Sequence, residues 1–411
     1  MMIAYHFPPL VGSSGIQRTL GFARALPALG WQPAILSAHP RAYEQARPEQ
    51  PGSLPDSLQV HRAFALDTSR HLAFFGRYPL SMALPDRWVT WLLGAIPAGL
   101  AMICQLKPAV LWSTYPIATA HLIGYWLARV SGLPWVADFR DPMAHEGYPP
   151  DQRAWQSFLK VEQRVFSRAN LCVFATEGAA QLYRKRYPRA ADRIRVIENG
   201  YDEADFVAAE TNLTNTPLNP GAFTLLHSGI VYPEWRNPIH LLQAIRQLLD
   251  VGRIDPASFR LRFRAPVHDA FLKEQIVKLQ LEQLVEIFPS VPYQDALAEM
   301  IRADGLLVLQ SDGCNDQIPA KFYEYIRAGR PILALTDSAG DTAEAMRKFG
   351  LNNIAPLDSP SAITDRLAIF LQQARSGQIP PIPTNMLRQA SRHERATLLA
   401  IMLNAVSCST A

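Results

Sequence analysis

The sequence predicts an α/β protein made of two similar halves, each a parallel sheet with helices on both faces. Three observations support this fold class. Short apolar runs alternate with helical patterns over almost the whole chain. The length of 411 residues exceeds what one ordinary hydrophobic core contains. A polar stretch rich in Thr, Asn, Pro and Gly, residues 207–222, interrupts the alternation and is typical of a linker.

The expected strands are short apolar runs with turn residues at their ends. In the first half they cover residues 2–7, 34–37, 58–62, 109–113, 135–138, 171–175 and 194–197. In the second half they cover residues 223–227, 260–263, 285–288, 305–310, 331–336 and 353–355. Helical patterns fill the intervals between these strands, as a parallel sheet requires.

The linker separates a first α/β domain, residues 1–206, from a second one, residues 223–384. Residues 385–411 have a helical pattern, and we expect this C-terminal helix to pack back on the first domain. Ligands of parallel sheets bind beyond the carboxyl ends of the strands. We therefore expect the active site in a cleft between the two domains.

The composition is that of a folded globular protein, with 48% hydrophobic and 18% charged residues. The formal net charge of +4 is small, and a nucleic-acid-binding protein usually has a concentrated basic face. The dense basic run at residues 184–195 is typical of a solvated helix end followed by a turn. We therefore expect no nucleic-acid partner.

The cysteines indicate a reducing compartment. Cys104, Cys172, Cys314 and Cys408 are widely spaced and lack the spacing of metal ligands. The chain opens on MMIAYHF, which is typical of a strand and has no basic region of a signal peptide. We expect a cytoplasmic protein.

Residues 88–106 carry no charged side chain and approach the length of a membrane span. However, Gly94, Pro97 and Gly99 interrupt this stretch, and Lys107 follows it directly. We expect a buried helix that can contact the inner membrane surface peripherally, and a membrane span is the alternative.

The most informative segment is 311–336, which predicts a loop, a short helix and a buried strand. Pro319 suits the first helical position, Phe322 and Ile326 share one face, and Gly329 supplies the stop. Such a helix, which starts at Pro319, Ala320 and Lys321, offers free backbone N–H groups and the positive end of its dipole to an anion.

Two carboxylates accompany this helix start. Glu324 lies one turn into the helix, where a carboxylate can hold vicinal sugar hydroxyls, and Asp316 precedes it in the loop. A diphosphate at the helix start with carboxylates on either side is the arrangement that a nucleotide-sugar needs. The alternative is that Glu324 only complements the helix dipole.

Two motifs of the first half have both a functional and a structural interpretation. Gly12 and Gly15 follow the first strand, where they allow close backbone approach to an anion or form a plain strand-to-helix turn. Arg140 and Asp141 follow the buried strand 135–138, where charge is costly unless it is paired or used. There the alternative is an ion pair of Arg140 with Asp138 or Asp141.

In the second half, Gly229 and Arg236 follow the first strand. A glycine turn and a cation suit a diphosphate, and an ordinary surface arginine is the alternative. The sequence shows no zinc spacing, no Walker loop and no Ser-His-Asp signature.

Five motifs in this order resemble the glycosyltransferase family 4 group of GT-B enzymes, over nearly the whole chain. They are FPPLVGSSG, LPWVADFRDP, VIENGYDEADF, HSGIVYPEWRNPIHLLQAI and IPAKFYEYIRAGRPILAL. Within this group, the chain most resembles the bacterial cell-surface polysaccharide transferases. The resemblance implies two Rossmann-like domains, acceptor binding in the first, nucleotide-sugar binding in the second, and transfer with retention of configuration without a metal or cofactor.

The resemblance also implies residue roles. Glu324 corresponds to the carboxylate expected to hold the ribose, and Asp316 to the glutamate that normally contacts the donor sugar. Arg236 corresponds to a phosphate-binding lysine, and Arg140 to an active-site histidine of some members. Gly12 and Gly15 correspond to the glycine loop near the phosphates.

The sequence departs from the family pattern at two positions. Ile230 stands where many members have a phosphate-binding arginine, and Lys321 or Arg264 is a candidate to replace that cation. Asp316 is one methylene shorter than the usual glutamate, which bears on donor identity and activity.

The sequence thus predicts a retaining glycosyltransferase that moves a sugar from a nucleotide-diphosphate sugar to a glycan or lipid-linked acceptor. In this hypothesis Arg236, Asp316, Glu324, Arg140 and Asp141 form the catalytic set. Two alternatives remain: a nucleotide-sugar 2-epimerase of the same fold, and a catalytically inactive glycosyltransferase-like subunit.

Overall fold

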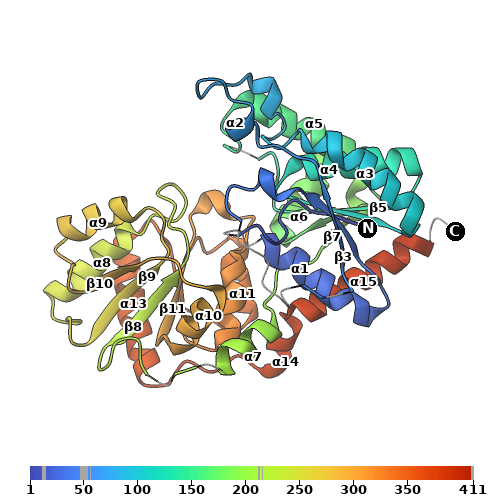
Figure 1. Ribbon diagram of the computed structural model, residues 1–411. Helices are drawn as coiled ribbons and strands as arrows, with labels where there is room; N and C mark the ends of the chain where they lie inside the picture. Colours follow the sequence, from blue (N-terminus) through green and yellow to red (C-terminus); the bar gives the residue numbers. More distant parts are fainter. Residues whose placement is uncertain are drawn as a thin grey trace. The chain divides into compact units, whose positions relative to one another are not determined.

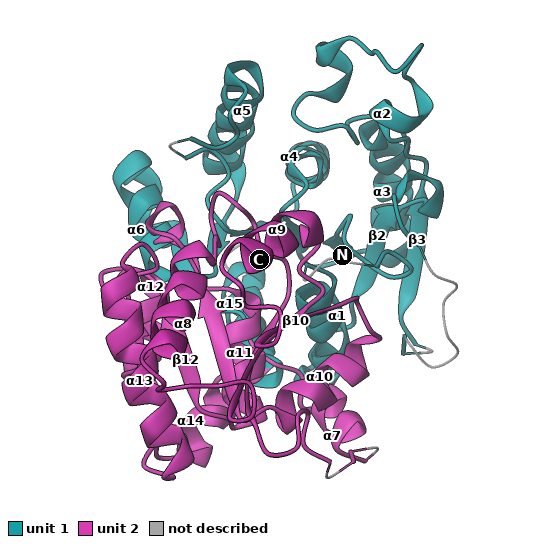
Figure 2. Cartoon of the chain, turned by 90° about the vertical axis from the view of Figure 1, so that its left-hand side faces the viewer, with its two compact units in different colours: residues 1–199, 392–411 teal, residues 200–391 magenta. Residues whose placement is uncertain are grey.

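The computed structural model describes residues 1–11, 15–46, 54–55, 57–145, 147–211, 213–214 and 216–408 (Figure 1). The chain divides into two compact units. The first consists of Met1–Asn199 with Arg392–Ala411, and the second is Gly200–Ser391 (Figure 2).

The described part of the first unit contains a parallel sheet with strand order β3-β2-β1-β4-β5-β6-β7. Its strands are β1 (Met2–Ile3), β2 (Ala34–Ala38), β3 (Gln59–Ala63), β4 (Leu111–Thr114), β5 (Trp135–Arg140), β6 (Leu171–Phe174) and β7 (Ile194–Val196). Its α-helices are α1 (Gly15–Ala25), α2 (Thr68–His71), α3 (Trp91–Leu106), α4 (Ala118–Ser131), α5 (Gln152–Arg168), α6 (Glu177–Arg186) and α15 (Arg392–Cys408). Short 3₁₀ helices are η1 (Leu26–Leu29), η2 (Pro40–Ala42), η3 (Leu80–Ala83) and η4 (Pro188–Arg193).

The second unit repeats this architecture with strand order β10-β9-β8-β11-β12-β13, again all parallel. Its strands are β8 (Phe223–Ser228), β9 (Phe259–Arg264), β10 (Val285–Phe288), β11 (Gly305–Leu309), β12 (Ile332–Leu335) and β13 (Ile354–Ala355). Its helices are α7 (Glu203–Thr211), α8 (Ile239–Asp250), α9 (Asp269–Lys278), α10 (Tyr293–Arg302), η5 (Asp312–Cys314), α11 (Ala320–Ala328), α12 (Asp341–Lys348), α13 (Pro360–Arg375) and α14 (Thr384–Gln389).

The predicted α/β fold with parallel sheets is confirmed, and every expected strand overlaps an observed one. The central strands are buried on both faces, as the continuous apolar runs indicated; Leu306, Leu307, Leu333 and Leu335 are fully buried. The first strand is shorter than expected, since β1 ends at Ile3. Ala4 still donates to the Leu36 carbonyl at 3.1 Å, and the chain then leaves the sheet ahead of Pro8 and Pro9, which have no N–H to donate.

The boundary between the units falls between Asn199 and Gly200, ahead of the expected linker. The first part of that stretch belongs to α7, which is held in the second unit. Arg327 of α11 pairs with Glu203 at 2.5 Å and with Glu210 at 2.9 Å, and Phe206 is fully buried. A polar composition therefore did not prevent a helix here, because ion pairs from another element hold it.

The apolar stretch at residues 88–106 forms α3, with Trp91, Ala95, Gly99 and Met102 buried. Within the described ranges, no helix combines the length and the apolar character needed to cross a bilayer. Gly99 is tightly packed, since a Cβ there would lie 2.6 Å from Leu127 of α4. The segment is therefore a helix, as expected, but only one of its faces is buried, and Leu93 on the other face is 73% exposed.

Candidate functional site

Helix α11 forms where the sequence predicts it. It covers Ala320–Ala328, with Phe322 and Ile326 fully buried and Gly329 at its C-terminus in the left-handed conformation (φ 69°). Pro319 differs by one position: it precedes the helix in an extended conformation (φ −55°, ψ 129°) and does not form its first turn. Pro319 still accepts a hydrogen bond from the Phe322 N–H at 2.9 Å, so the helix start is defined.

The start of α11 is tied to the end of β8 by two side chains. The Lys321 ammonium donates a hydrogen bond to the Ser228 carbonyl, and the Tyr325 hydroxyl accepts one from the Ser228 N–H at 2.9 Å. Gly229 follows in a conformation that favours glycine (φ 141°), and a Cβ there would overlap the Lys321 ammonium. The absence of a side chain at Gly229 thus makes room for Lys321.

Glu324 lies on the same helix as Lys321, one turn further along, and is only 7% exposed. The Tyr293 hydroxyl, at the start of α10, donates to Glu324 Oε1 at 2.7 Å. Burial lowers the pKa of Lys321 to about 8, the Glu324 carboxylate opposes this shift, and the Arg236 guanidinium adds to it. A cation and a carboxylate therefore sit together at the helix start.

Arg236 lies in the loop after β8. Its guanidinium lies over the Tyr232 ring, 5.5 Å from the ring centroid, and the backbone N–H of Arg236 donates to the Tyr232 carbonyl at 2.8 Å. Among the residues that the structure describes, no carboxylate forms an ion pair with Arg236. Its charge remains available to an anion.

The structure distinguishes the two candidates for the cation missing at Ile230. Arg264 is committed elsewhere, because it donates to both oxygens of Glu299 at 2.7 Å and to the Pro289 carbonyl at 2.8 Å. Lys321 instead reaches the backbone directly before Ile230, at Ser228 and Gly229. Of the two candidates, the one that lies beside Ile230 in the chain's fold is therefore Lys321.

Asp316 lies half-buried in the loop between η5 and α11, and this loop is braced from inside. Gln310, at the end of β11, donates through Nε2 to the Cys314 carbonyl at 2.6 Å and to the Gln317 carbonyl at 2.7 Å. The Thr342 hydroxyl of α12 also donates to the Gln317 carbonyl, at 3.0 Å. The backbone on either side of Asp316 is therefore fixed.

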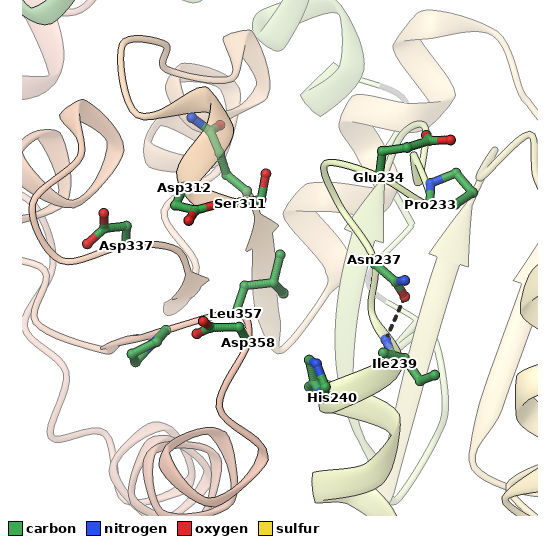
Figure 3. Close-up of a pocket in the computed structure, with 12 residues that line it drawn as sticks. Pro233, Glu234, Asn237, Ile239, His240, Ser311, Asp312, Asp337, Leu357 and Asp358 are labelled. Carbon is green, nitrogen blue, oxygen red and sulfur yellow. Dashed lines mark hydrogen bonds between the residues drawn. The ribbon is translucent and has the colours of Figure 1, made fainter. Parts of the chain in front are cut away.

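A cavity of about 440 Å³ opens at the carboxyl ends of β8, β11, β12 and β13 (Figure 3). Figure 3 shows Asp312, Asp337 and Asp358 on one side of it and Glu234 and His240 on the other. Its remaining lining residues are Pro233, Asn237, Ile239, Gln310, Ser311, Pro356 and Leu357. The described residues contain no group of His, Cys, Asp and Glu arranged to hold a metal.

None of the site residues expected from the sequence lines this cavity, although Glu234 and Asn237 flank Arg236 in the chain. The acidic lining was missed by sequence reasoning. The available signal was positional, since Asp312 and Asp337 each come shortly after an expected strand, at the sheet edge where ligands bind.

In the first unit, Arg140 ends β5 in the left-handed conformation (φ 63°), with its side chain 7% exposed. The alternative ion pairs of the sequence analysis do not form among the described residues. Asp138 pairs instead with Arg18 of α1, through Oδ1 at 2.8 Å and Oδ2 at 3.0 Å. Arg18 was not identified from the sequence as a site residue, because 120 residues separate the partners.

The Arg140 guanidinium is incompletely satisfied. Its Nη1 donates to the Tyr115 carbonyl at 3.3 Å, whereas its buried Nε has no hydrogen-bond partner in the described part of the chain. A Cβ on Gly15 would lie 2.7 Å from Arg140 Nη1 and 2.6 Å from His6 Nδ1, so both side chains lie against the start of α1. Gly12, the other expected glycine, lies outside the described residues.

Burial shifts the pKa of two titratable groups near Arg140. Burial raises the pKa of Asp141, and the Arg140 guanidinium opposes this shift. Burial and the Arg140 charge lower the pKa of His6 to about 3, so that the imidazole is neutral. The buried cation beside a helix start is therefore a candidate anion-binding group of the first unit.

The expected site residues thus fall into two groups. Arg140, Asp141 and Gly15 belong to the first unit. The second unit brings together Gly229, Lys321 and Glu324 at one helix start, with Arg236, Asp316, Pro319 and Ala320 on the loops and turn beside them.

The comparisons with known proteins agree with this architecture. Residues 14–200 match the model of the glycosyl transferase 4-like domain. Sucrose-phosphate synthase from Thermosynechococcus elongatus is similar in structure (TM-score 0.61, 13% identity, covering 100% of this chain and 96% of that one). So is α,α-trehalose 6-phosphate synthase from Burkholderia multivorans (TM-score 0.62, 12% identity, covering 100% and 94%).

HepE from Anabaena, solved in complex with UDP, is a third similar structure (TM-score 0.58, 13% identity, covering 100% of this chain and 97% of that one). No curated protein sequence matches the chain. Residues 14–200 thus match a glycosyl transferase 4-like domain, and the two parallel α/β units have the GT-B fold of the similar solved structures.

Proposed function

We propose that this protein is a glycosyltransferase that moves a sugar from a UDP-sugar to a glycan or lipid-linked acceptor. In this proposal the transfer retains the configuration of the sugar. It serves the synthesis of a cell-surface polysaccharide on the cytoplasmic side of the membrane. The choice of UDP as the nucleotide is supported by the similar structure of HepE, which has been solved in complex with UDP and with UDP-glucose. The nucleotide-sugar site of this proposal lies at the start of α11 in the second unit.

The observation that carries the proposal is the position of Lys321. Its ammonium lies against Ser228 and Gly229, at the end of the first strand of this unit, where Ile230 supplies no charge. A diphosphate at this point would accept hydrogen bonds from Lys321 and Arg236 and from free N–H groups at the start of α11. Two cations and a helix start match the charge of a nucleoside diphosphate.

Glu324 and Tyr293 support the ribose end of the proposed site. The Glu324 carboxylate accepts from the Tyr293 hydroxyl through Oε1, which fixes its position, and its second oxygen can accept from a ribose hydroxyl. In the same proposal Asp316, on its braced loop, contacts the hydroxyls of the donor sugar. Because aspartate is shorter than glutamate, we expect Asp316 to influence which donor sugar is accepted.

The proposed chemistry needs no covalent bond to the protein and no metal or cofactor. The bond between the anomeric carbon and the diphosphate oxygen breaks while the acceptor hydroxyl attacks from the same face. The leaving diphosphate takes the proton of that hydroxyl. Negative charge builds up on the diphosphate, and Lys321, Arg236 and the start of α11 stabilise it.

In this proposal the first unit binds the acceptor. Arg140, whose Nη1 lies against Gly15 and whose buried Nε has no hydrogen-bond partner among the described residues, offers a donor to an anionic or strongly polar group. Asp141, whose pKa is raised by burial, lies next to it in the chain. We expect these residues to contribute to transfer and not to UDP binding by the second unit.

A Lys321→Met variant tests the donor site. Methionine keeps most of the length of the unbranched side chain and removes its charge. We expect UDP to bind at least about tenfold more weakly, as for the loss of a charge-assisted hydrogen bond. Because the pKa of Lys321 is about 8, the wild-type protein loses this charge above pH 8. Its affinity for UDP should then fall by up to about tenfold per pH unit above 8, the limit for one proton.

Isothermal calorimetry with UDP between pH 7 and pH 9.5 measures both effects, with Lys278→Ala as control. Lys278 is an exposed lysine at the end of α9 in the same unit, and its loss should leave affinity and pH dependence unchanged. Wild-type affinity in Lys321→Met, or equal pH dependence in both proteins, would contradict the proposal. UDP-glucose binding without turnover on any acceptor would favour the inactive-subunit alternative.

A further inference from the structure

The segment between α2 and η3 exposes two adjacent aromatic rings. Phe74 is 78% and Phe75 is 92% exposed, the two highest values among the exposed large hydrophobic side chains of the described residues. Their rings contact each other edge to face, with centroids 4.6 Å apart. Leu80 and Met82 follow in the same segment and are also exposed, at 37% and 39%. The segment lies next to α2 in Figure 1.

A tight turn holds these rings outward. Phe74 N–H donates to the Arg77 carbonyl at 2.8 Å and Arg77 N–H donates to the Phe74 carbonyl at 3.0 Å, so Phe75 and Gly76 form a two-residue hairpin loop. Both loop residues have positive φ, 51° and 73°. Asn, Asp and Gly usually occupy such positions, and a phenylalanine there costs about 1 kcal/mol of backbone strain. A polar residue at position 75 would suit folding better.

The charged side chains around the turn are basic. Residues 68–85 contain two arginines, Arg70 and Arg77, and no aspartate or glutamate. Arg70 donates to the Tyr43 carbonyl, and Arg77, within the hairpin itself, is exposed. The nearest acids in the sequence are occupied internally. Asp67 accepts from the Ser69 N–H at 3.0 Å, and Asp86 accepts from the Thr119 N–H at 2.8 Å.

We propose that this aromatic hairpin, residues 72–82, docks the protein on an anionic lipid bilayer. Phe74 and Phe75 enter the headgroup and acyl boundary, and the exposed Arg77 faces the lipid phosphates. The inference goes beyond the proposed function, since docking requires neither donor nor transfer.

Vesicle co-sedimentation tests the proposal, with the full chain, vesicles of phosphatidylcholine alone, and vesicles that also contain phosphatidylglycerol. Wild-type protein should bind the anionic vesicles more tightly. Replacing both rings, as F74S together with F75S, should weaken binding by at least about tenfold, as expected from the apolar area of two phenylalanines. Arg77→Glu should remove most of the difference between the two vesicle types.

The matched control replaces Val251 and Val277 by serine. These residues are also exposed, at 69% and 59%, but belong to the second unit, and their loss should leave vesicle binding unchanged. Equal binding of the double Phe variant and wild type would overturn the proposal. A change of molecular mass in solution without a change in vesicle binding would overturn it in favour of self-association.

UDP calorimetry on the same variants separates this proposal from the proposed function. The hairpin variants should bind UDP as wild type does, because the hairpin belongs to the first unit and the proposed donor site to the second. If no protein bound UDP while the Phe variant still lost vesicle binding, docking would stand and the proposed donor site would fail.

Discussion

Gly229 shows at the scale of one residue how the chain places a cation without an arginine in the usual position. Its φ of 141° directs the backbone away from the region that other residues prefer, and the Lys321 side chain occupies the space where a Cβ would lie. Sequence reasoning identified both residues as candidates for phosphate binding. It did not show that Gly229 and Lys321 touch, because they are far apart in the sequence. Lys321 binds the carbonyl of Ser228, next to Gly229, and 93 residues separate Ser228 from Lys321.

Gly229→Ala should therefore displace Lys321. We expect UDP binding to weaken by at least about tenfold and the free energy of unfolding to fall by about 1–2 kcal/mol from backbone strain and overlap. Gly252→Ala is the control, since Gly252 also has positive φ (70°) but faces open space. It should lose about 1 kcal/mol of stability and keep its UDP affinity. A Gly229→Ala protein with normal UDP affinity would show that Gly229 does not position Lys321.

At the scale of elements, an ion-pair network joins β9, β10 and α10. Glu299 of α10 accepts from Arg264 at 2.7 Å and from Arg262 at 3.1 Å, and Arg262 also pairs with Glu286 of β10 at 2.8 Å. The Phe288 ring lies 4.5 Å from the Arg262 guanidinium and 4.9 Å from that of Arg264. The network explains why two arginines are tolerated on a strand of the sheet, and why neither is available to a phosphate.

Glu299→Ala removes the shared partner of both arginines. Because the Glu299 side chain is only 7% exposed, the variant leaves poorly solvated positive charge, and we expect a loss of about 3–5 kcal/mol of unfolding free energy in urea titrations. The control is Glu177→Ala, which breaks an exposed pair with Arg184 and should cost at most about 1 kcal/mol. Equal effects of the two substitutions would mean that burial does not decide the energetics of the Glu299 network.

At the scale of the whole molecule, the chain completes its first unit with its last helix. Helix α15 packs against α1, and Leu399 and Leu403 are buried in a cluster that also contains Phe22 and Trp112. The chain therefore passes between the units twice, after Asn199 and after Ser391. The first unit cannot complete its core until the second has been synthesised.

Leu399→Ala tests the contribution of α15 to the first unit. Leu399 is 1% exposed, and its truncation should cost about 2–5 kcal/mol through lost burial and the cavity it leaves. Ile401→Ala, on the exposed face of the same helix at 59%, should change stability by no more than about 0.5 kcal/mol. Thermal unfolding with and without UDP is the measurement, since UDP should stabilise the second unit in both variants. A Leu399→Ala protein as stable as Ile401→Ala would contradict this packing role.

The sequence by itself determined the class and order of the elements. Each buried strand is a local apolar run, and helix α11, with its glycine stop and Glu324, is specified by residues within a few turns of one another. Such signals need no partner from elsewhere in the chain. The family resemblance rests on the same local motifs, and the domain match and fold confirm it.

Only the tertiary structure decided which distant side chains meet. Lys321 at Ser228, Tyr293 at Glu324 and Arg18 at Asp138 are pairs that join different elements, and no periodicity or spacing specifies them. The same holds for exposure: Phe74 and Phe75 are apolar residues that sequence reasoning assigns to the interior as readily as to the surface. Burial and pairing depend on the packing of the complete fold, so they become visible only when the elements are assembled.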